Sequence, residues 1–493
     1  MILLAFIVVA LLALAAIALS TDHRRMNAAC ILHAFLYLVL TLYILLFQQL
    51  PVSSFLVGSQ YFFMDRLGLF EVLIASAVFT CAAVYAGGYV ESLLSSGELA
   101  KGSLKLFYAS WTMLLLVLVL AFFCDNLALF WICAELTTIL SAMLVAILAA
   151  RENIDAAIKY IFIASASMLF TFVGLIFLFE TSRTVMGTGT LNWTVLMQHA
   201  PAFPAGMALA AFALIFTGFA AKSGIFPFHT WLPEAHAKAP SAVSAILSAV
   251  LLNVGIYGIL RVWAIAHQTA AASTIALFIS LFGFLTVGIA AISMLPEKNL
   301  KKLVAFSSIE NMGILLIGMA VATPVAIFWI LFHVMAHSLT KASLFFSAGI
   351  LHRQYRSHLS ADAMDEIRDV FRFQPLAAWG IIIGGLAITG MPLFPVFFSK
   401  LFLLLQLGAV SPAALFVLLV LLFIAAAALG YFVITAFSAI TAPGTRPDIV
   451  PYLTPLTMKL PVVFLIGLIV IAGTVFLPGE ISFLDRIVRE LMF

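Results

Sequence analysis

The sequence predicts an all-α polytopic membrane protein with about 14 transmembrane helices. Of its 493 residues, 65% are hydrophobic and only 9% are charged, whereas a soluble globular protein carries about 25% charged residues. The aromatic content of 13% excludes a disordered chain. One crossing with its connection takes roughly 35 residues, and apolar runs of about 20 residues are typical of helices, not of barrel strands.

The apolar runs divide the chain into fourteen predicted spans joined by short loops. The first run lacks a basic leader and a cleavage site of small residues, so we expect it to be retained as a span. The longest hydrophilic stretch, about 351–375, is too short to fold by itself, so residues 1–493 are expected to form a single membrane domain. The spans are about 2–20, 28–48, 67–90, 107–124, 127–149, 157–181, 205–236, 241–263, 273–295, 300–322, 324–350, 376–407, 412–440 and 460–477.

Lysine and arginine residues gather in alternate loops between the spans. Sixteen of the 24 fall on one side of the predicted membrane and only five fall on the other. Because positively charged loops stay in the cytoplasm, this bias places both termini on the outer face. The net charge of +3 is too balanced to indicate nucleic-acid binding. The five on the outer side are Arg66, Arg183, Arg261, Arg486 and Arg489.

The four cysteines show no CxxC spacing and fall in or beside apolar segments. We therefore expect them to be buried as small hydrophobic side chains, not to form a disulfide framework or a zinc site. No metal and no cofactor is expected. The cysteines are Cys30, Cys81, Cys124 and Cys133.

Two predicted spans, the seventh and the twelfth, are too long and are interrupted by proline. Lys222 precedes Pro227 in the seventh span, and Lys400 follows Pro395 in the twelfth. Proline breaks a helix, and irregular backbone at membrane depth is tolerated only where it is buried in protein or lines a cavity. Two such breaks five spans apart indicate the two halves of a repeat and a transport site, although two independent kinks would leave the same pattern.

Ionisable residues inside the spans are the candidate functional residues, because a charge at the bilayer centre costs about 2.5–3.5 kcal/mol. Glu135 lies near the middle of the fifth span and could pair with Lys222. Opening such a pair would let the buried lysine release its proton at lower cost, as a relay requires. A static bridge between two helices is the alternative.

His333, His337 and Lys341 lie at positions i, i+4 and i+8 of the eleventh span. They therefore share one helix face over about 12 Å. Since histidine titrates near neutral pH, this stripe is typical of a proton wire, which Lys400 would end. Haem ligation is disfavoured because both imidazoles project from one side of one helix. Histidines bonded to neighbouring carbonyls are the structural alternative.

Weaker candidates for the relay are polar residues of the neighbouring spans, which also serve as ordinary packing contacts in membrane helices. Glu71 and Glu180 are instead expected to lie at the membrane interface. The weaker candidates are Glu310, Asn253, Ser248, Ser165, Ser167, His229 and His236.

The stretch from Ala221 to Ala245, AKSGIFPFHTWLPEAHAKAPSAVSA, resembles the signature of the antiporter-like subunits of respiratory complex I. Mrp-type cation/proton antiporters and energy-converting nickel–iron hydrogenases share that signature. The residues around Glu135 and Glu310 are most similar to membrane subunits of formate hydrogenlyase and related hydrogenases. The resemblance implies two inverted five-helix repeats, roughly 107–263 and 273–440, with helices 7 and 12 broken.

The same resemblance assigns roles to the charged residues of the spans and shows two departures. Several members of the family carry a lysine where this chain has Asn253, and others carry a histidine near Ser248. The long C-terminal lateral helix of the largest complex I subunit is expected to be absent. The implied proton pathway consists of Glu135, Lys222, His333, His337, Lys341 and Lys400.

The resemblance implies a proton-translocating subunit of a complex I-like or hydrogenase assembly in the inner membrane of a prokaryote. The chain shows no cysteine cluster and no nucleotide loop, so we expect no redox chemistry of its own. Its expected partners are other membrane subunits, hydrophilic redox subunits, the lipid bilayer, and protons or Na⁺. The alternatives are an Mrp-type Na⁺/H⁺ antiporter subunit without a redox partner, a scaffold with vestigial charges, and a solute permease.

Overall fold

The computed structural model describes residues 2–53, 61–355, 370–438 and 451–492, and within these ranges the chain is almost entirely helical. The only strands in these ranges are the two-residue β1 (Val52–Ser53) and β2 (Phe63–Met64), which pair antiparallel. The predicted all-α class is therefore confirmed. The helices are α1 (Ile2–Leu19), α2 (His23–Phe47), α3 (Arg66–Ser95), α4 (Leu104–Phe122), α5 (Leu127–Val145), α6 (Arg151–Met186), α7 (Trp193–His199), α8 (Ala205–Lys222), α9 (Trp231–Lys238), α10 (Ser241–Ile246), α11 (Leu252–Ala266), α12 (Ala272–Met294), α13 (Leu300–Val321), α14 (Pro324–Tyr355), α15 (Val370–Phe373), α16 (Pro375–Thr389), α17 (Pro395–Val410), α18 (Pro412–Ser438), α19 (Leu456–Thr474) and α20 (Pro478–Met492). Short segments of tighter or wider winding are η1 (Lys101–Ser103), η2 (Ala146–Leu148), η3 (Ala200–Ala202), η4 (Phe228–Thr230) and η5 (Leu247–Leu251).

Among the described residues, thirteen helical segments are long and apolar enough to cross a membrane. The apolar helices α16 and α17, which are shorter, together occupy the predicted twelfth span. Each of the fourteen predicted spans thus corresponds to one helix or to one interrupted helix. In the seventh, α8 is followed by η4 and α9, so both predicted breaks are present.

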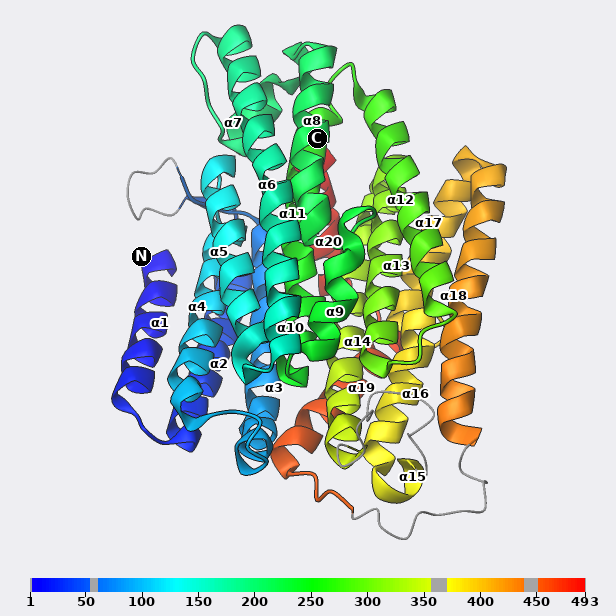
Figure 1. Ribbon diagram of the computed structural model, residues 1–493. Helices are drawn as coiled ribbons and strands as arrows, with labels where there is room; N and C mark the ends of the chain where they lie inside the picture. The colour runs from blue at the N-terminus through cyan, green and yellow to red at the C-terminus, as the bar shows by residue number, and fades with distance from the viewer. Residues whose placement is uncertain (1, 54–60, 356–369, 439–450, 493) are drawn as a thin grey trace.

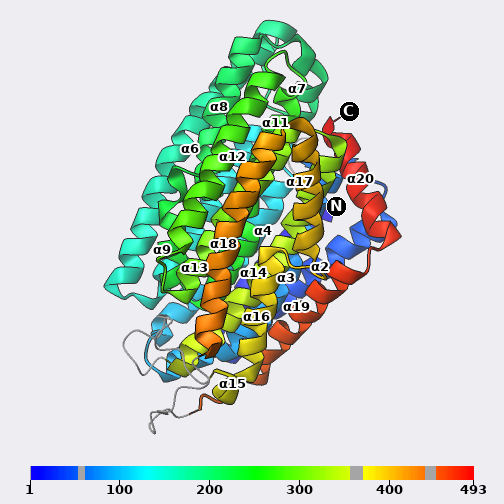
Figure 2. The ribbon, with the colours of Figure 1, turned by 90° about the vertical axis from the view of Figure 1, so that its right-hand side faces the viewer.

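The long helices run side by side, with α1 at one edge of the bundle and α18 at the other (Figure 1). The span formed by α10, η5 and α11 lies in the interior, where every residue from Ser241 to Ala266 is buried. Any polar side chain of this span must therefore find its partner inside the protein. The two termini lie toward the same end of the bundle (Figure 2).

Two glycines allow neighbouring spans to approach closely. A Cβ atom on Gly218 of α8 would lie 2.0 Å from the Thr171 hydroxyl oxygen of α6. A Cβ on Gly313 of α13 would lie 2.9 Å from the carbonyl oxygen of Gly283 in α12. Small residues at such points let membrane helices pack backbone to backbone, since lipid supplies little hydrophobic drive for their association.

The structure adds elements that the hydropathy pattern did not predict, namely the β1–β2 ribbon, α7, α15 and α20. α20 is amphipathic and lies against the bundle, where its Glu490 pairs with Arg66 at the start of α3. It buries Leu484, Ile487, Val488 and Leu491. A polar helix of this kind is invisible to a search for apolar runs, because only one of its faces is hydrophobic.

The part of the predicted 351–375 loop that covers residues 356–369 lies outside the described residues, and so do the basic residues Arg356, Arg368 and Arg446. The two repeats at 107–263 and 273–440 stay a prediction. All four cysteines are free and buried, as expected from their apolar surroundings.

Candidate functional site

The first break ends α8 at Lys222 through a glycine turn. Gly224 has a φ of 66°, which favours glycine, and the amide of Ile225 donates back to the Ala220 carbonyl. This is the Schellman arrangement that closes many helices. Trp231 of α9 donates its indole N–H to the carbonyl of Ala221 at 2.9 Å, which ties the second half of the span to the end of the first.

Lys222 is 1% exposed, and its Nζ donates to the Thr138 hydroxyl of α5 at 2.8 Å. Among the described residues, no carboxylate lies within 4 Å of this ammonium. The expected direct pair with Glu135 is therefore not formed. The reason is helical geometry, because Thr138 is nearly one turn further along α5 than Glu135.

Glu135 is half-buried on the side of α5 that also carries exposed apolar residues such as Ile132 and Leu136. One carboxylate oxygen accepts a hydrogen bond from Ser165 of α6 at 2.8 Å. The other carboxylate oxygen is buried without a hydrogen-bond partner. This glutamate thus lies between the interior of the subunit and its outer wall.

The second break repeats the construction of the first. α16 ends at Thr389, Gly390 has a φ of 88°, and the amide of Met391 donates back to the Leu386 carbonyl. Lys400 of α17 donates to the carbonyl of Ile388 at 3.0 Å. A cation is favoured there, because the last carbonyls of a helix have no partner within the helix and carry partial negative charge.

Lys400 also forms a buried ion pair with Glu310 of α13, with 2.9 Å between Nζ and Oε1. Glu310 was a weaker candidate from the sequence, and it is the partner of the lysine that ends the predicted wire. The two side chains are only 8% and 2% exposed. Lys400 is therefore held by a carboxylate, unlike Lys222.

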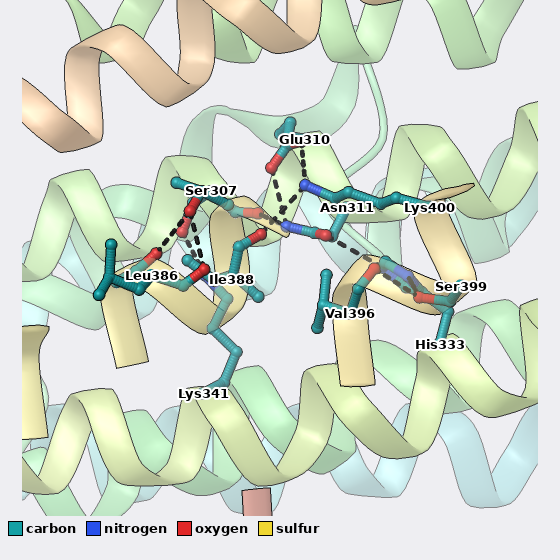
Figure 3. A network of polar contacts seen from close by, with 12 residues as sticks. Ser307, Glu310, Asn311, His333, Lys341, Leu386, Ile388, Val396, Ser399 and Lys400 are labelled. Atoms are coloured by element: carbon teal, nitrogen blue, oxygen red, sulfur yellow. Dashed lines mark hydrogen bonds and ion pairs between the residues drawn. The ribbon is translucent and has the colours of Figure 1, made fainter. Parts of the chain in front are cut away.

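His333 connects this ion pair to α14 through a chain of hydrogen bonds (Figure 3). The amide nitrogen of Asn311 donates to Glu310 at 2.8 Å, and its oxygen contacts Nε2 of His333 at 3.0 Å. Because an amide oxygen only accepts, Nε2 of His333 must carry a proton. Nδ1 then faces the Ser399 hydroxyl at 2.8 Å and is free to accept a proton.

His337 and Lys341 continue the stripe along α14, and both are fully buried. Lys341 donates to the carbonyl of Val304 at 2.7 Å and to the hydroxyl of Ser307. Neither ring nitrogen of His337 has a hydrogen-bond partner among the residues that the structure describes. The ring centroids of His333 and His337 are 6.4 Å apart, which is too far for direct proton transfer and suits one bridging water.

The weaker candidates of the eighth span are also engaged. Ser248 lies in the π-helical segment η5, and its hydroxyl contacts that of Ser308 in α13 at 2.8 Å. π-Helical turns are frequent at functional sites. Asn253 is the second residue of α11, just after η5, and donates to Glu71 of α3 and to Ser338 of α14.

Among the described residues, the two histidines of the seventh span form no hydrogen bond with the α14 stripe. His229 is in η4 at the break, and its Nδ1 has no partner. His236 of α9 is fully buried, stacks on Phe345 of α14 with 4.8 Å between ring centroids, and has both nitrogens unpartnered.

The expectation for Glu71 was wrong. It does not lie at the interface but is 1% exposed inside the bundle, bonded to Asn253 at 3.1 Å. Its position near the start of α3 gave no sign of this, because burial there depends on the neighbouring α11 and α14. Glu180, by contrast, is exposed and pairs with Arg183.

The sequence also missed a buried ion pair at the end of the bundle where α3 begins, between Asp65 and Arg261. The distance between Asp65 Oδ2 and Arg261 Nη2 is 2.6 Å, and both side chains are at most 3% exposed. The guanidinium lies 4.0 Å from the ring centre of Trp193. The sequence signal was a single arginine near the end of an apolar span, which was interpreted only as a topological charge. In the described part of the chain, no group of three His, Cys, Asp or Glu residues could hold a metal ion.

Similarity to known proteins assigns the chain to a family. A family described as NADH:quinone oxidoreductase/Mrp antiporter, TM, matches residues 124–430, which is more than half of the sequence. This chain belongs to that family. A relative in it, the hydrogenase-4 component F homolog of Methylacidiphilum infernorum (isolate V4), is 31% identical over 383 residues. That alignment covers 77% of this chain and 78% of the relative.

Two solved structures share the fold of this NADH:quinone oxidoreductase/Mrp antiporter chain. The membrane-bound sulfane sulfur reductase, an archaeal respiratory membrane complex, superposes with a TM-score of 0.86 at 18% identity, covering 99% of this chain and 96% of the other. The Mrp complex from Dietzia sp. DQ12-45-1b gives 0.83 at 18% identity, covering 100% and 99%. The chain is thus an antiporter-like membrane subunit of the type found in complex I-like, hydrogenase and Mrp complexes.

Proposed function

We propose that this subunit translocates protons across the membrane through Glu135, Lys222, Lys341, His337, His333 and Lys400, driven by redox chemistry in partner subunits. The observation that carries the proposal is the buried chain of hydrogen bonds from Ser399 through His333, Asn311 and Glu310 to Lys400. Such a chain joins a titratable imidazole to an ion pair inside the bundle, where polar groups are costly and mark pathways.

The three buried lysines differ in their partners, and this difference supports a direction of charge movement within the subunit. Lys222 and Lys341 are hydrogen-bonded only to hydroxyl and carbonyl oxygens among the described residues. Lys400 is paired with Glu310. In a low-dielectric interior a lysine without a carboxylate gives up its proton more easily than a lysine in an ion pair. We therefore assign ready proton exchange to Lys222 and Lys341, and to Lys400 an exchange that first requires its ion pair to open.

Glu135 acts in this proposal as the switch of the first half-site. Lys222 is hydrogen-bonded to Thr138, which lies nearly one turn from Glu135 along α5. The carboxylate therefore acts on the lysine through its electrostatic field, over a distance of about one helical turn. A positive charge brought close to Glu135 would weaken that field and favour release of the proton of Lys222. The proton then reaches Lys341 and passes to His337 and His333 through bridging water.

The last step is governed by the ion pair. A proton arriving at Nδ1 of His333 makes an imidazolium whose Nε2–H still points at Asn311, and the positive charge favours loss of the proton held by Lys400. Glu310 keeps the neighbouring charge balanced during this exchange. Release on the far side therefore requires the Lys400–Glu310 contact to lengthen.

The position of Glu135 supports a membrane partner at the α5–α6 wall. A carboxylate near the middle of a span is costly next to lipid, and Glu135 is only half-buried, on the side of α5 that carries exposed apolar residues. A neighbouring membrane subunit that covers this side of α5 would shield the carboxylate from lipid. We further propose that hydrophilic redox subunits complete the complex, and that it lies in a prokaryotic inner membrane with both termini of this chain outside.

The test uses the intact complex reconstituted in proteoliposomes. Lys222→Ala and Lys341→Ala should each abolish redox-driven proton uptake while leaving the redox half-reaction measurable. Lys105→Ala is the matched control, because Lys105 is an exposed lysine that bonds only the Ala18 carbonyl. Proton transport at the unmodified rate in both buried-lysine variants would overturn the proposal.

The same vesicles distinguish the Mrp-type alternative. If this subunit works as a Na⁺/H⁺ antiporter without a redox partner, a Na⁺ gradient should dissipate a pH gradient in the absence of reductant. Proton movement that needs reductant and ignores Na⁺ favours the redox-coupled function.

A further inference from the structure

Glu71 of α3 is a buried carboxyl that is not a member of the proposed pathway, and its burial has no explanation there. Its side chain is 1% exposed and accepts a hydrogen bond from the amide of Asn253 at 3.1 Å. Among the described residues, no lysine, arginine or histidine nitrogen lies within 4 Å of its oxygens. A lone carboxylate in such surroundings is strongly disfavoured, so Glu71 rests as the protonated acid.

Glu71 is connected to helix α14 by two side chains. The amide nitrogen of Asn253 donates both to Glu71 and, at 3.2 Å, to the hydroxyl of Ser338. Ser338 follows His337 directly in α14 and lies nearly one turn before Lys341. The hydroxyl of Ser338 donates to the Val334 carbonyl of the same helix. Glu71 is therefore linked through an amide and a hydroxyl to the helix that carries His337 and Lys341, and water would complete the path to those two side chains.

In the other direction, a polar face leads from Glu71 to the end of the bundle. Asn253, Tyr257 and Arg261 are at positions i, i+4 and i+8 of α11 and share one helix face over about 12 Å. Tyr257 accepts a hydrogen bond from Arg261 at 2.8 Å. Arg261 pairs with Asp65, which caps the start of α3 about 9 Å along that helix from Glu71.

This face ends at a pocket of about 670 Å³. Several of the residues that line it are polar or charged, so water can occupy it. Asp65 is a member of both the pocket wall and the buried ion pair. Polar residues of the wall include Asp65, Thr194, Gln198, Gln268 and Glu490.

We propose that Glu71 is a proton-binding site on a side branch that connects the α14 stripe with the pocket at Asp65. The inference rests on the proposed proton-translocating function. The protonated Glu71 would first release its proton to water along Tyr257 and Arg261. A proton leaving the nitrogen of Lys341 or His337 would then bind the carboxylate oxygen of Glu71 through water beside Ser338 and restore the acid. Asn253 positions the carboxyl and carries no proton itself, because an amide is a poor base.

The contrast between the carboxyls supports this assignment. Asp65 and Glu310 are each held as anions by a guanidinium or an ammonium at less than 3 Å. Glu71 alone among these three has only a neutral amide for a partner. A protonated acid next to a relay can both give and take a proton, whereas a carboxylate fixed in an ion pair can do so only after the pair opens.

The experiment measures protons transported per redox turnover by the whole complex in proteoliposomes, for Glu71→Gln and Glu71→Asp. Glutamine keeps the hydrogen bond from Asn253 through its amide oxygen but cannot exchange a proton. Glu71→Gln should reduce transport about tenfold or more with redox turnover retained, and Glu71→Asp should restore part of it. Glu180→Gln is the control, since that exposed glutamate pairs only at the surface.

A second readout separates proton binding from a structural role. Infrared difference spectra of the complex should show the C=O stretch of a protonated carboxylic acid that responds to turnover, disappears in Glu71→Gln and shifts in Glu71→Asp. If Glu71→Gln fails to assemble, the shift of this band in Glu71→Asp decides the matter, and its absence overturns the proposal.

Failure of the side-branch proposal can be distinguished from failure of the proposed function. Normal transport in Glu71→Gln together with loss of transport in Lys341→Ala would overturn the side branch and leave the proposed function standing. Normal transport in both variants would overturn both.

Discussion

Breaking the buried Lys400–Glu310 ion pair should destabilise the subunit more than removing both of its members. At 2.9 Å the two charges attract each other by about 6 kcal/mol at an effective dielectric constant of about 20. This attraction is offset by a desolvation cost of several kcal/mol for each ion. Glu310→Gln leaves the ammonium with the Ile388 carbonyl as its remaining partner, so we expect a loss of about 3–5 kcal/mol. Lys400→Met should cost a similar amount, because it leaves the carboxylate unpaired.

The four buried cysteines supply the assay. A maleimide dye that fluoresces on reaction with thiols should label the folded chain slowly and the unfolded chain rapidly, since all four thiols are buried. Thermal unfolding followed in this way gives a Tm for each variant in detergent. Each kcal/mol shifts Tm by about 2–4 °C in a domain of 150–250 residues and by less in a longer chain, so each single variant should lose several degrees.

The double variant Glu310→Gln/Lys400→Met should recover part of the Tm lost by the single variants. The matched control is the pair Lys159–Glu234, which has the same 2.9 Å separation but side chains 41% and 44% exposed. Its double-mutant cycle should give a coupling of less than about 1 kcal/mol. Strictly additive losses at Lys400 and Glu310 would refute the buried-pair interpretation, because additivity means that the two side chains do not interact.

Further predictions concern the packing, the buried Asp65–Arg261 pair and the C-terminal helix α20, and the same thermal assay checks each of them. Gly255→Val should lower Tm by an amount equivalent to about 1–3 kcal/mol, because a Cβ there would lie 2.5 Å from the Phe219 carbonyl oxygen. Gly467→Val is the control and should be tolerated, because a Cβ at Gly467 has no atom within 4 Å. Arg261→Met should lower the free energy of unfolding by about 3–5 kcal/mol, because it leaves the buried Asp65 unpaired. A smaller loss in Arg261→Lys would show that the positive charge stabilises the pair even without the guanidinium geometry. Burial raises the pKa of Glu480 in α20, so its stabilising contribution is present at low pH and is lost as the pH rises through the folded-state pKa. Glu480→Gln should therefore raise Tm at neutral pH and remove that part of the pH dependence, and an unchanged pH profile would contradict the reasoning.

The fold was largely predictable because burial in lipid leaves a direct mark on composition. A span must be apolar for about 20 residues and must satisfy its own backbone, so hydropathy located each long apolar helix of the described residues. Proline and glycine then located the two breaks, since Gly224 and Gly390 take the positive φ that ends each first half. The polar helix α20 was not predicted, because a helix that lies against a bundle needs only one apolar face.

The candidate site was predictable only within single helices. Periodicity put His333, His337 and Lys341 on one face, and the structure has all three buried on α14. Periodicity says nothing about which helix that face meets. The structure therefore decided that Lys400 pairs with Glu310, 90 positions away, and that Lys222 meets Thr138 and not Glu135.

The sequence by itself determined the membrane helices, their breaks and the rare charges that the bilayer makes costly, because each of these depends on the local balance of apolar and polar groups. The tertiary structure decided which of those charges are paired. Glu71 lay in an apolar run and was taken for an interfacial residue, yet it meets Asn253 from a helix 182 positions away. The physical reason is that a charge is stabilised or left alone by groups within about 4 Å, and in a helical bundle those groups come from other helices.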